Sequence, residues 1–484
     1  MMYKKDLNIL KYTSLAGILY ILPIVVAGMN YSDDFMRSAD GVFGLSIMAR
    51  PLADLIFKLI SLNSSLNISA APLTHILSIL AMCFSVLFLV KSLNRKYNYT
   101  DALILSLVIF NPFYIQNLLY KFDSITMSLG VLIASVSVWL CSKQALSTKI
   151  LSIALLVASL SLYQPCAGIF VAMVIIRCID EVSRGISLNI KKYFTYLICF
   201  LVGYVSYYIF IVIPYSEGSS RSSFISPGSG MTEKIGNNLL SLWGKTSTFT
   251  PVGNELLILL SLISFSICVY ASFKSEKPIA GIFVSILAFP ASYFAIGGVI
   301  IFLKESLFFP RTLVTYGLFL ALLIYPIYNF NHKLSRLLAV TTAGLLVSVS
   351  FLTMSITVTA IRSQEQYEDK ILNNLSYDLE NLKLNSSETY ISGIFNYSLY
   401  AKNAVDNNGI AKLLSNRGYD WTVSYKLRDY GLNVPFSFKR DMQKKLIKSI
   451  CSDRYNSKTA RTEYTIYQVG GKNLVNIGGD VDCR

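Results

Sequence analysis

Long apolar windows that are nearly free of charged side chains recur along this chain, and they constrain its fold more than any other feature. About 20 apolar residues in a helix cross the hydrocarbon core of a bilayer, so each window predicts a membrane-spanning helix. With 53% hydrophobic and 15% charged residues, the composition is that of a polytopic membrane protein. The predicted spans are 10–30, 73–92, 101–120, 123–142, 193–215, 253–273, 278–298, 309–330 and 335–360.

The window 150–176 carries no charge but is interrupted by Tyr163, Gln164 and Pro165. It forms either one kinked helix or two half-length helices that enter from one face and return, because proline breaks a helix. Lys and Arg concentrate in cytoplasmic loops, and only the returning, re-entrant pair keeps most loop bases on one side. We therefore expect a cytoplasmic N-terminus, about eleven membrane segments and a tail, residues 362–484, on the outer side.

The net charge of +15 comes from loops between apolar spans and not from a basic soluble face, which argues against a nucleic-acid partner. A Gly-rich phosphate-binding loop followed by Lys-Ser or Lys-Thr is absent from the sequence, which argues against an ATP-driven machine.

Three regions are expected on the far side of the membrane: the loop 31–72, the loop 216–251 and the tail 362–484. The domains are thus 1–361, in the membrane, and 362–484. The segment 46–62 has the helical spacing of an interfacial helix, and an amphipathic piece lies near 232–245.

The tail changes character and predicts a small mixed α/β domain. Residues 388–395 and 462–469 alternate like strands, whereas 409–418 and 439–451 have helical spacing and stop signals. Among eight cysteines, Cys451 and Cys483 are the two in the tail, and an oxidising compartment favours a disulfide between them. With two histidines and no Cys-x-x-Cys, a zinc site is unsupported.

Acidic residues at the non-cytoplasmic mouth are the candidates for chemistry. Asp33 and Asp34 follow the first span, and Asp123 is expected to begin the fourth span on the same face. One interpretation is that they anchor helix ends at the interface. The other is that they are functional, because keeping carboxylates at a membrane edge costs free energy. The bases expected at similar depth are Arg37, Arg50, Lys121, Lys304 and Arg311.

A carboxylate can act as general base toward a hydroxyl, and basic residues can hold a phosphate leaving group. This combination suits transfer from a lipid phosphate to a sugar hydroxyl on the outer face. Arg311 is a candidate for the phosphate or a helix-end anchor. The candidates for sugar contacts, each with a structural alternative, are Tyr31, Tyr163, Gln164 and, for the acceptor, Trp421.

The stretch YSDDFMRSADG (31–41) followed by MARPLADLIFKLI (48–60) resembles the opening signature of the bacteriophage-borne, serotype-converting O-antigen glucosyltransferases of the Gtr type II family. The segments 120–129 and 161–168 are similar to later parts of that family, and the tail agrees in architecture. Ala49 departs from the glycine expected before Arg-Pro.

The resemblance implies a GT-C type glycosyltransferase of the bacterial inner membrane. Its donor is undecaprenyl-phosphate glucose, and its acceptor is lipid-linked O-antigen in the periplasm. GT-C enzymes usually place a catalytic acid in the first outer loop, so the resemblance implies that Asp33 or Asp34 is the base of an inverting transfer, with a slight preference for Asp34. The matching arginines, Arg37 and Arg50, would bind phosphate or orient the acid.

The implied functional partners are membrane lipids, a donor-lipid synthase and a donor-lipid flippase. No cofactor is required, because arginine or lysine can supply the stabilisation that a metal often gives, although the two aspartates could bind a divalent ion.

Two alternatives stay open. A lipid-linked oligosaccharide flippase or transporter would need polar residues along a mid-membrane path or paired repeats. Another O-antigen-modifying transferase, such as a ligase or an acyltransferase, is the second. An acyltransferase would want a catalytic histidine near the acids, and neither His75 nor His332 is expected there.

Overall fold

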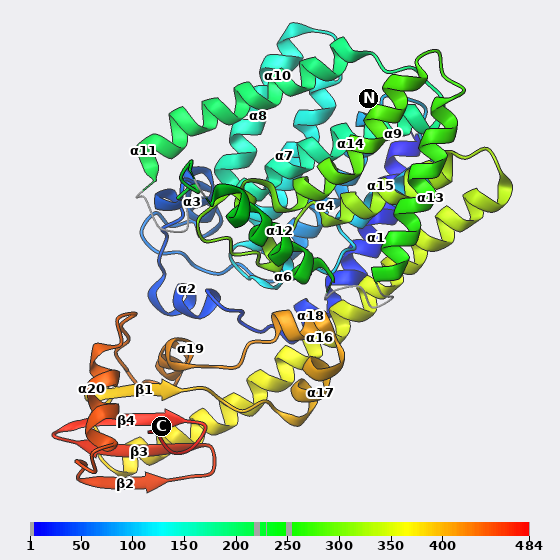
Figure 1. Cartoon of the computed structure of the whole chain (residues 1–484). Helices are drawn as coiled ribbons and strands as arrows, with labels where there is room; N and C mark the ends of the chain where they lie inside the picture. The colour runs from blue at the N-terminus through cyan, green and yellow to red at the C-terminus, as the bar shows by residue number, and fades with distance from the viewer. Residues whose placement is uncertain (1–3, 217–222, 229, 248–253, 484) are drawn as a thin grey trace. The chain divides into compact units, whose positions relative to one another are not determined.

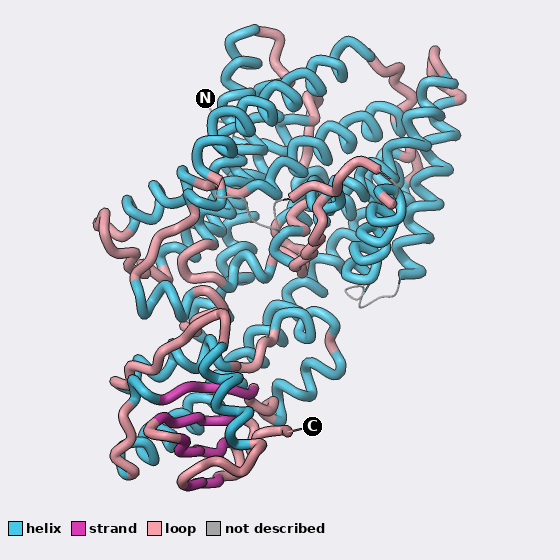
Figure 2. Tube along the Cα trace, turned by 60° about the vertical axis from the view of Figure 1, so that its left-hand side comes forward, coloured by secondary structure: helices cyan, strands magenta, loops and turns pink. Residues whose placement is uncertain are grey.

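The computed structural model describes residues 4–216, 223–228, 230–247 and 254–483. Most of them are helical, and the strands gather near the C-terminus (Figures 1 and 2). The chain divides into two compact units, which we describe separately. Unit 1 comprises Met1–Val26, Phe43–Ser64 and Ala70–Met354, and unit 2 comprises Ala27–Val42, Ser65–Ser69 and Ser355–Arg484.

Unit 1 is a helical bundle. Among the described residues, seven helical segments are long and apolar enough to cross a membrane, so the chain is a membrane protein, as expected. They are α1 (Lys4–Ala27), α4 (Leu73–Ser92), α7 (Ser124–Cys141), Ile190–Tyr215, which holds α10 (Ile190–Tyr207) and α11 (Ile213–Tyr215), α13 (Asn254–Ser272), Pro278–Phe302, which begins with α14 (Pro278–Gly297), and α16 (Lys333–Asn381). The predicted number of about eleven segments exceeds these seven.

Shorter helices complete unit 1 and fill the spaces between the long ones. The predicted amphipathic piece near 232–245 is confirmed as α12, whereas residues 217–222, 229 and 248–251 of its loop lie outside the described residues. The remaining helices are α3 (Pro51–Ile60), α5 (Tyr99–Leu105), α6 (Ile115–Leu119), α8 (Leu146–Leu162), α9 (Ala167–Ser183), α12 (Met231–Ser247) and α15 (Tyr316–Asn329).

The predicted span 101–120 is wrong as a single helix. α5 ends early, the chain turns at Asn111 and Pro112, and the short α6 follows. Pro112 has no amide hydrogen for a helical bond, and the Asn111 side chain donates to the carbonyls of Leu107 and Val108 at 3.2 and 3.0 Å. Proline in an apolar window was the signal for this break.

The window 150–176 forms two helices, α8 and α9, on either side of the predicted break, and each has 17 residues. At the break, the Tyr163 hydroxyl donates to the carbonyl of Arg311 at 2.6 Å. Near the other end of α9, Asp180 pairs with Arg95, which follows α4. The chain therefore runs to the break and returns, and the two helices are longer than the half-length pair expected.

Unit 2 contains a four-stranded sheet in the order β1-β4-β3-β2, which confirms the small mixed α/β fold of the tail. β1 (Thr389–Gly393) pairs in parallel with β4 (Lys472–Ile477), and the pairs of β4 with β3 (Tyr464–Val469) and of β3 with β2 (Ser457–Ala460) are antiparallel. The helices are α2 (Asp34–Asp40), part of α16, α17 (Leu399–Asn407), α18 (Gly409–Leu414), α19 (Asp420–Lys426) and α20 (Asp441–Ile450).

The sheet buries both faces. On one face, Ile466 and Val475 pack with Leu372 and Leu375 of α16, and on the other, Leu474 packs with Leu446 of α20. Alternation along β3 and β4 supplies these two apolar faces, since successive side chains of a strand point to opposite sides.

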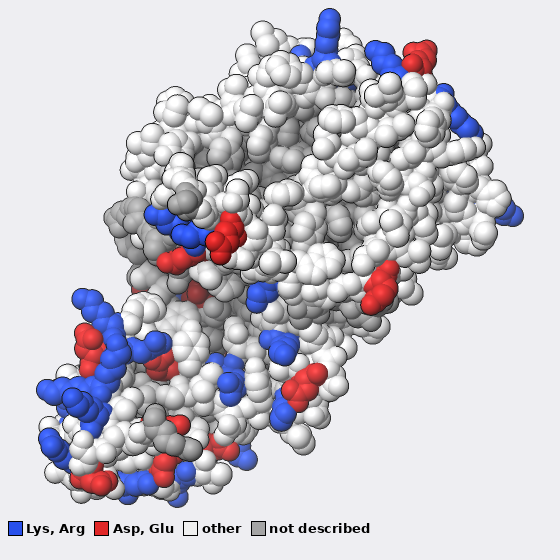
Figure 3. Space-filling model, in the orientation of Figure 1, with Lys and Arg blue, Asp and Glu red and all other residues white. Residues whose placement is uncertain are grey.

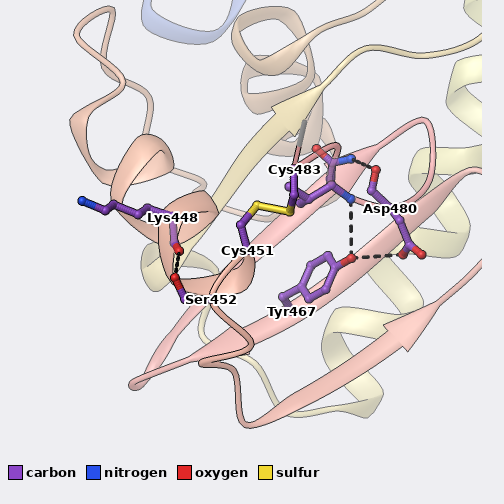
Figure 4. The surroundings of a disulfide bond; sticks show 8 residues. Lys448, Cys451, Ser452, Tyr467, Asp480 and Cys483 are labelled. Carbon is purple, nitrogen blue, oxygen red and sulfur yellow. Dashed lines mark hydrogen bonds between the residues drawn. A yellow bond between two sulfur atoms is a disulfide. The ribbon is translucent and has the colours of Figure 1, made fainter.

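The disulfide between Cys451 and Cys483 is present, as predicted, with an S–S distance of 1.96 Å (Figure 4). It joins the end of α20 to the segment after β4. Beside it, the Asp480 carboxylate accepts from the Tyr467 hydroxyl at 3.0 Å, from Thr465 at 2.9 Å and from Lys458 at 2.8 Å.

Charged side chains are unevenly distributed between the two units. On the face drawn in Figure 3, broad stretches of unit 1 show none, whereas Lys, Arg, Asp and Glu crowd the surface of unit 2. This is the distribution expected where one unit faces lipid and the other water.

Candidate functional site

The acidic pair belongs to unit 2. Residues 27–42 pack with the tail, although more than 300 positions separate them in sequence. The Tyr31 hydroxyl donates to the carbonyl of Leu414 at 3.1 Å, and Asp40 at the end of α2 pairs with Arg428. The tail therefore contacts both ends of this segment, residues 27–42, which we call the acidic segment.

The two carboxylates of the pair have different surroundings. Asp34, the first residue of α2, is fully buried, and its carboxylate accepts from the Tyr31 amide at 3.0 Å. Asp33 is half-buried, and the Ser32 hydroxyl donates to its Oδ1 at 3.4 Å. A base must reach its substrate, so the exposure favours Asp33, while Asp34 fixes the turn that carries it. Arg37 is buried on the same short helix.

A separate group of basic and polar side chains lies in unit 1, around Arg50. The loop before α3 is tied by Asp54, whose carboxylate accepts from the amides of Leu45 and Ser46 at 3.0 and 2.7 Å and from the Ser46 hydroxyl at 2.6 Å. This fold leaves Ala49 in the left-handed region, with φ of 59°. Glycine adopts that conformation without strain, which agrees with the glycine expected here from the sequence.

Gln164, at the break between α8 and α9, clamps this loop with both ends of its amide. Its Oε1 accepts from Arg50 Nε at 2.5 Å, and its Nε2 donates to the carbonyl of Met48 at 2.8 Å. The Arg50 guanidinium also lies over the Tyr163 ring, 4.9 Å from the centroid. Two of the predicted candidates, Tyr163 and Gln164, therefore hold the Arg50 side chain at the break between α8 and α9.

Arg311 lies close to the same residues. Its amide donates to Gln116 Oε1 at 2.8 Å, its carbonyl accepts from Tyr163 and Asn117, and its guanidinium donates to the Tyr120 hydroxyl. Gln116, Asn117 and Tyr120 were missed from the sequence. Polar residues inside an apolar window are a sign of function and could have marked the first two.

Electrostatics link Arg50 to its neighbours. Burial lowers the pKa of the Arg50 guanidinium from its ordinary value, Arg311 lowers it further, and Tyr163 and Asp123 raise it. In the described part of the chain, the Arg50 guanidinium forms no ion pair. Both arginines are half-buried, and two guanidinium groups that repel each other can stabilise an anion such as a phosphate.

The other predicted residues of unit 1 are placed as follows. Asp123 immediately precedes α7, as expected, and is buried. The carbonyl of Lys121 accepts from the Thr74 hydroxyl at 2.8 Å. Lys304 is exposed, its amide donates to the carbonyl of Ser223 at 2.9 Å, and no contact joins its side chain to Arg50 or Arg311 among the described residues.

Two further observations bear on substrates. Trp421 is 8% exposed in unit 2, where it lines a pocket with Tyr31. Within the ranges that the structure describes, no group of three or more His, Cys, Asp or Glu side chains could hold a metal ion.

Comparison with known proteins identifies the family. The family model described as glucosyl transferase GtrII matches residues 22–323, which include the acidic pair, Arg50, Gln164 and Arg311. The chain belongs to the GtrII glucosyl transferase family. This confirms the resemblance seen in the sequence.

A relative in Salmonella phage P22 is 28% identical over 438 residues, which cover 84% of this chain and 87% of the relative. It is described as an uncharacterized 55.3 kDa protein in the gtrB 5' region. No solved structure matches this chain. As a member of the GtrII family, the chain is a glycosyltransferase and takes a sugar donor and an acceptor.

Proposed function

We propose that the chain transfers a glucosyl group from undecaprenyl-phosphate glucose to a sugar hydroxyl of lipid-linked O-antigen, on the periplasmic face of the bacterial inner membrane. In this proposal the N-terminus is cytoplasmic, the tail is periplasmic, and the modification converts serotype. Family membership supports glucosyl transfer, and the paired guanidinium groups of Arg50 and Arg311 support an anionic leaving group.

The transfer is a single displacement. Asp33 takes the proton of the acceptor hydroxyl as that oxygen attacks the anomeric carbon, and the bond from this carbon to the phosphate oxygen breaks. The phosphate leaves as an anion without protonation, so a general acid is not required. Attack opposite the leaving group inverts the anomeric configuration.

The arginines act on the donor in this proposal. Arg50 and Arg311 bind the phosphate and stabilise its growing charge, and Gln164 fixes the Arg50 guanidinium in place. Guanidinium groups supply the positive charge, so the reaction is proposed to need no metal. A donor-lipid synthase and a donor-lipid flippase would supply the substrate.

The observation that carries the proposal is the difference between the two aspartates, one half-buried and one buried and bonded to the Tyr31 amide. The test expresses the chain in a host that supplies lipid-phosphate glucose and measures hexose addition to O-antigen by mass and linkage. Asp33→Asn is expected to abolish addition. Asp34→Asn keeps an acceptor for the Tyr31 amide and is expected to retain part of it. Unchanged addition by Asp33→Asn would remove the proposed base.

Topology has its own test. A reporter fused after residue 484 that is active only in the periplasm supports the orientation, and one active only in the cytoplasm reverses it.

A further inference from the structure

A pocket in unit 2 joins the acidic segment to the tail. Its cavity volume is about 60 Å³. Every residue that lines it belongs to unit 2, so its shape does not depend on unit 1. The lining residues that matter here are Ser32, Phe35, Glu365, Asn416, Tyr419 and Trp421.

The walls of the pocket are aromatic and its rim is polar. The rings of Tyr419 and Trp421 lie 6.1 Å apart at 44°, and Phe35 adds a third ring. Asn416 is exposed, and Glu365 is half-buried. Flat apolar surfaces with a few polar groups suit a sugar, which has apolar ring faces and a border of hydroxyls.

Trp421 carries an unused donor. Its side chain is more than nine-tenths buried, and its indole N–H has no hydrogen-bond partner within the described chain. Buried donors are normally paired, and an unpaired one calls for a bound water or ligand. A ligand hydroxyl is an acceptor of the required kind.

Most charged side chains that line the pocket are paired, and Arg417, which has no ion pair among the described residues, lies over the Tyr397 ring, 4.9 Å from its centroid. Glu368 accepts from Lys426 at 2.8 Å, from Gln364 at 2.9 Å and from the Gly418 amide at 2.6 Å. Glu365 pairs with Arg362 at 2.6 Å. Among the described residues, Arg417 is left without an acidic partner, and one guanidinium stacked on a ring is no cluster for a phosphate, so a neutral ligand fits better than an anionic one.

The pocket adjoins the proposed base. Ser32 lines it and donates its hydroxyl to Asp33. Asp33 also acts on Tyr419: burial and the nearby carboxylates of Asp420 and Asp33 raise the pKa of the Tyr419 phenol. A sugar bound against the Tyr419 ring therefore has Asp33 nearby.

We propose that this pocket is the binding site for the acceptor glycan, a neutral oligosaccharide, and that the Trp421 indole N–H donates to one of its hydroxyls. The inference rests on the proposed function, since it assigns the acceptor of that reaction to the tail. Apart from the acidic segment, the lining residues lie beyond residue 323, where the match to the family model ends. The tail would therefore decide which O-antigen is modified.

The test uses the full chain in nanodiscs and, as probe, delipidated O-polysaccharide from a strain that the wild type modifies. Trp421→Phe keeps a ring and loses the donor, so its affinity is expected to fall ~3–10-fold, with a matching rise in acceptor KM. Its KM for the donor lipid should not change. Asn416→Ala, at the exposed rim, should weaken binding without affecting the fold, and Trp139→Phe, in α7 of unit 1, is the control that should leave binding unchanged.

Failure of the inference and failure of the proposed function look different. Asp33→Asn should bind the polysaccharide like wild type while transferring no hexose. If wild type does not bind the probe, or Trp421→Phe and Asn416→Ala both bind as tightly as Trp139→Phe, the pocket is not the acceptor site. If Asp33→Asn still transfers hexose, Asp33 is not the base, and the binding data alone decide whether the pocket is the acceptor site.

Discussion

The buried ion pair in the wall of the pocket gives the sharpest prediction on stability. Lys426 Nζ lies 2.8 Å from Glu368 Oε2, and the two side chains are 6% and 3% exposed. The same ammonium lies 4.9 Å from the centre of the Phe35 ring. A Cβ at position 418 would meet Glu368 Oε2 at 2.7 Å, so a larger residue than Gly418 would have to displace this carboxylate. One pair thus ties α16, α19 and the acidic segment together within unit 2.

We expect Lys426→Met to lower the free energy of unfolding of unit 2 by about 3–5 kcal/mol, because it leaves Glu368 charged, buried and without its cation. The remaining donors, Gln364 and the Gly418 amide, are neutral and do not replace it. For a unit of this size the loss corresponds to a midpoint of thermal unfolding lower by about 10–20 °C.

The assay is urea unfolding of the full chain in nanodiscs, read by pulse proteolysis of the tail. The exposed pair Lys402–Asp406, at 2.6 Å, provides the matched control, and Lys402→Met should cost about 0.5 kcal/mol or less. Adding Glu368→Gln to Lys426→Met removes the stranded charge and should restore at least half of the loss. A Lys426→Met variant as stable as Lys402→Met would refute the reasoning.

Three further predictions follow from local geometry. Ala49→Gly should raise the free energy of unfolding of unit 1 by up to about 1 kcal/mol, because glycine relieves the left-handed φ of 59°; a loss measured by detergent unfolding would contradict this. Cys451→Ser should lower the free energy of unfolding of unit 2 by about 3–4 kcal/mol, because the disulfide closes a loop with a sequence separation of 32. Reduction of the wild type with dithiothreitol should lower it by the same amount. Lys458 and Thr465 lower the pKa of Asp480, so its contribution is present above the ordinary aspartate value, near pH 4, and is lost as pH falls through the lowered pKa. Urea titrations from pH 5 to pH 2 should therefore show a shallower acid loss for Asp480→Asn than for wild type.

Local patterns were sufficient to predict much of the fold. Charge-free windows identified the long helices, and alternation identified β1 and β3 in the tail. Compartment reasoning found the Cys451–Cys483 disulfide. The prediction for 101–120 was wrong because hydropathy does not register Pro112, and the local hydrogen bonds of Asn111 decide the chain direction there.

The site was less accessible to sequence reasoning, because its residues are far apart in the chain. The spacing of the acids could not show that Asp34 is buried and Asp33 half-buried, since the hydrogen bond from the Tyr31 amide to the Asp34 carboxylate decides this. Gln164 was a candidate for sugar contact, and the structure places it on Arg50 instead. Only the fold brings residues 27–42 to the tail, and with them the pocket around Trp421.

The central claim is that Asp33 removes the acceptor proton while a lipid phosphate leaves. Single-turnover transfer from undecaprenyl-phosphate glucose, by purified full chain in nanodiscs, tests it most directly. We predict a rate ~10²–10⁴-fold lower for Asp33→Asn than for wild type, and an inverted anomeric configuration in the wild-type product. A retained configuration, or a rate for Asp33→Asn within a few-fold of wild type, would contradict the account.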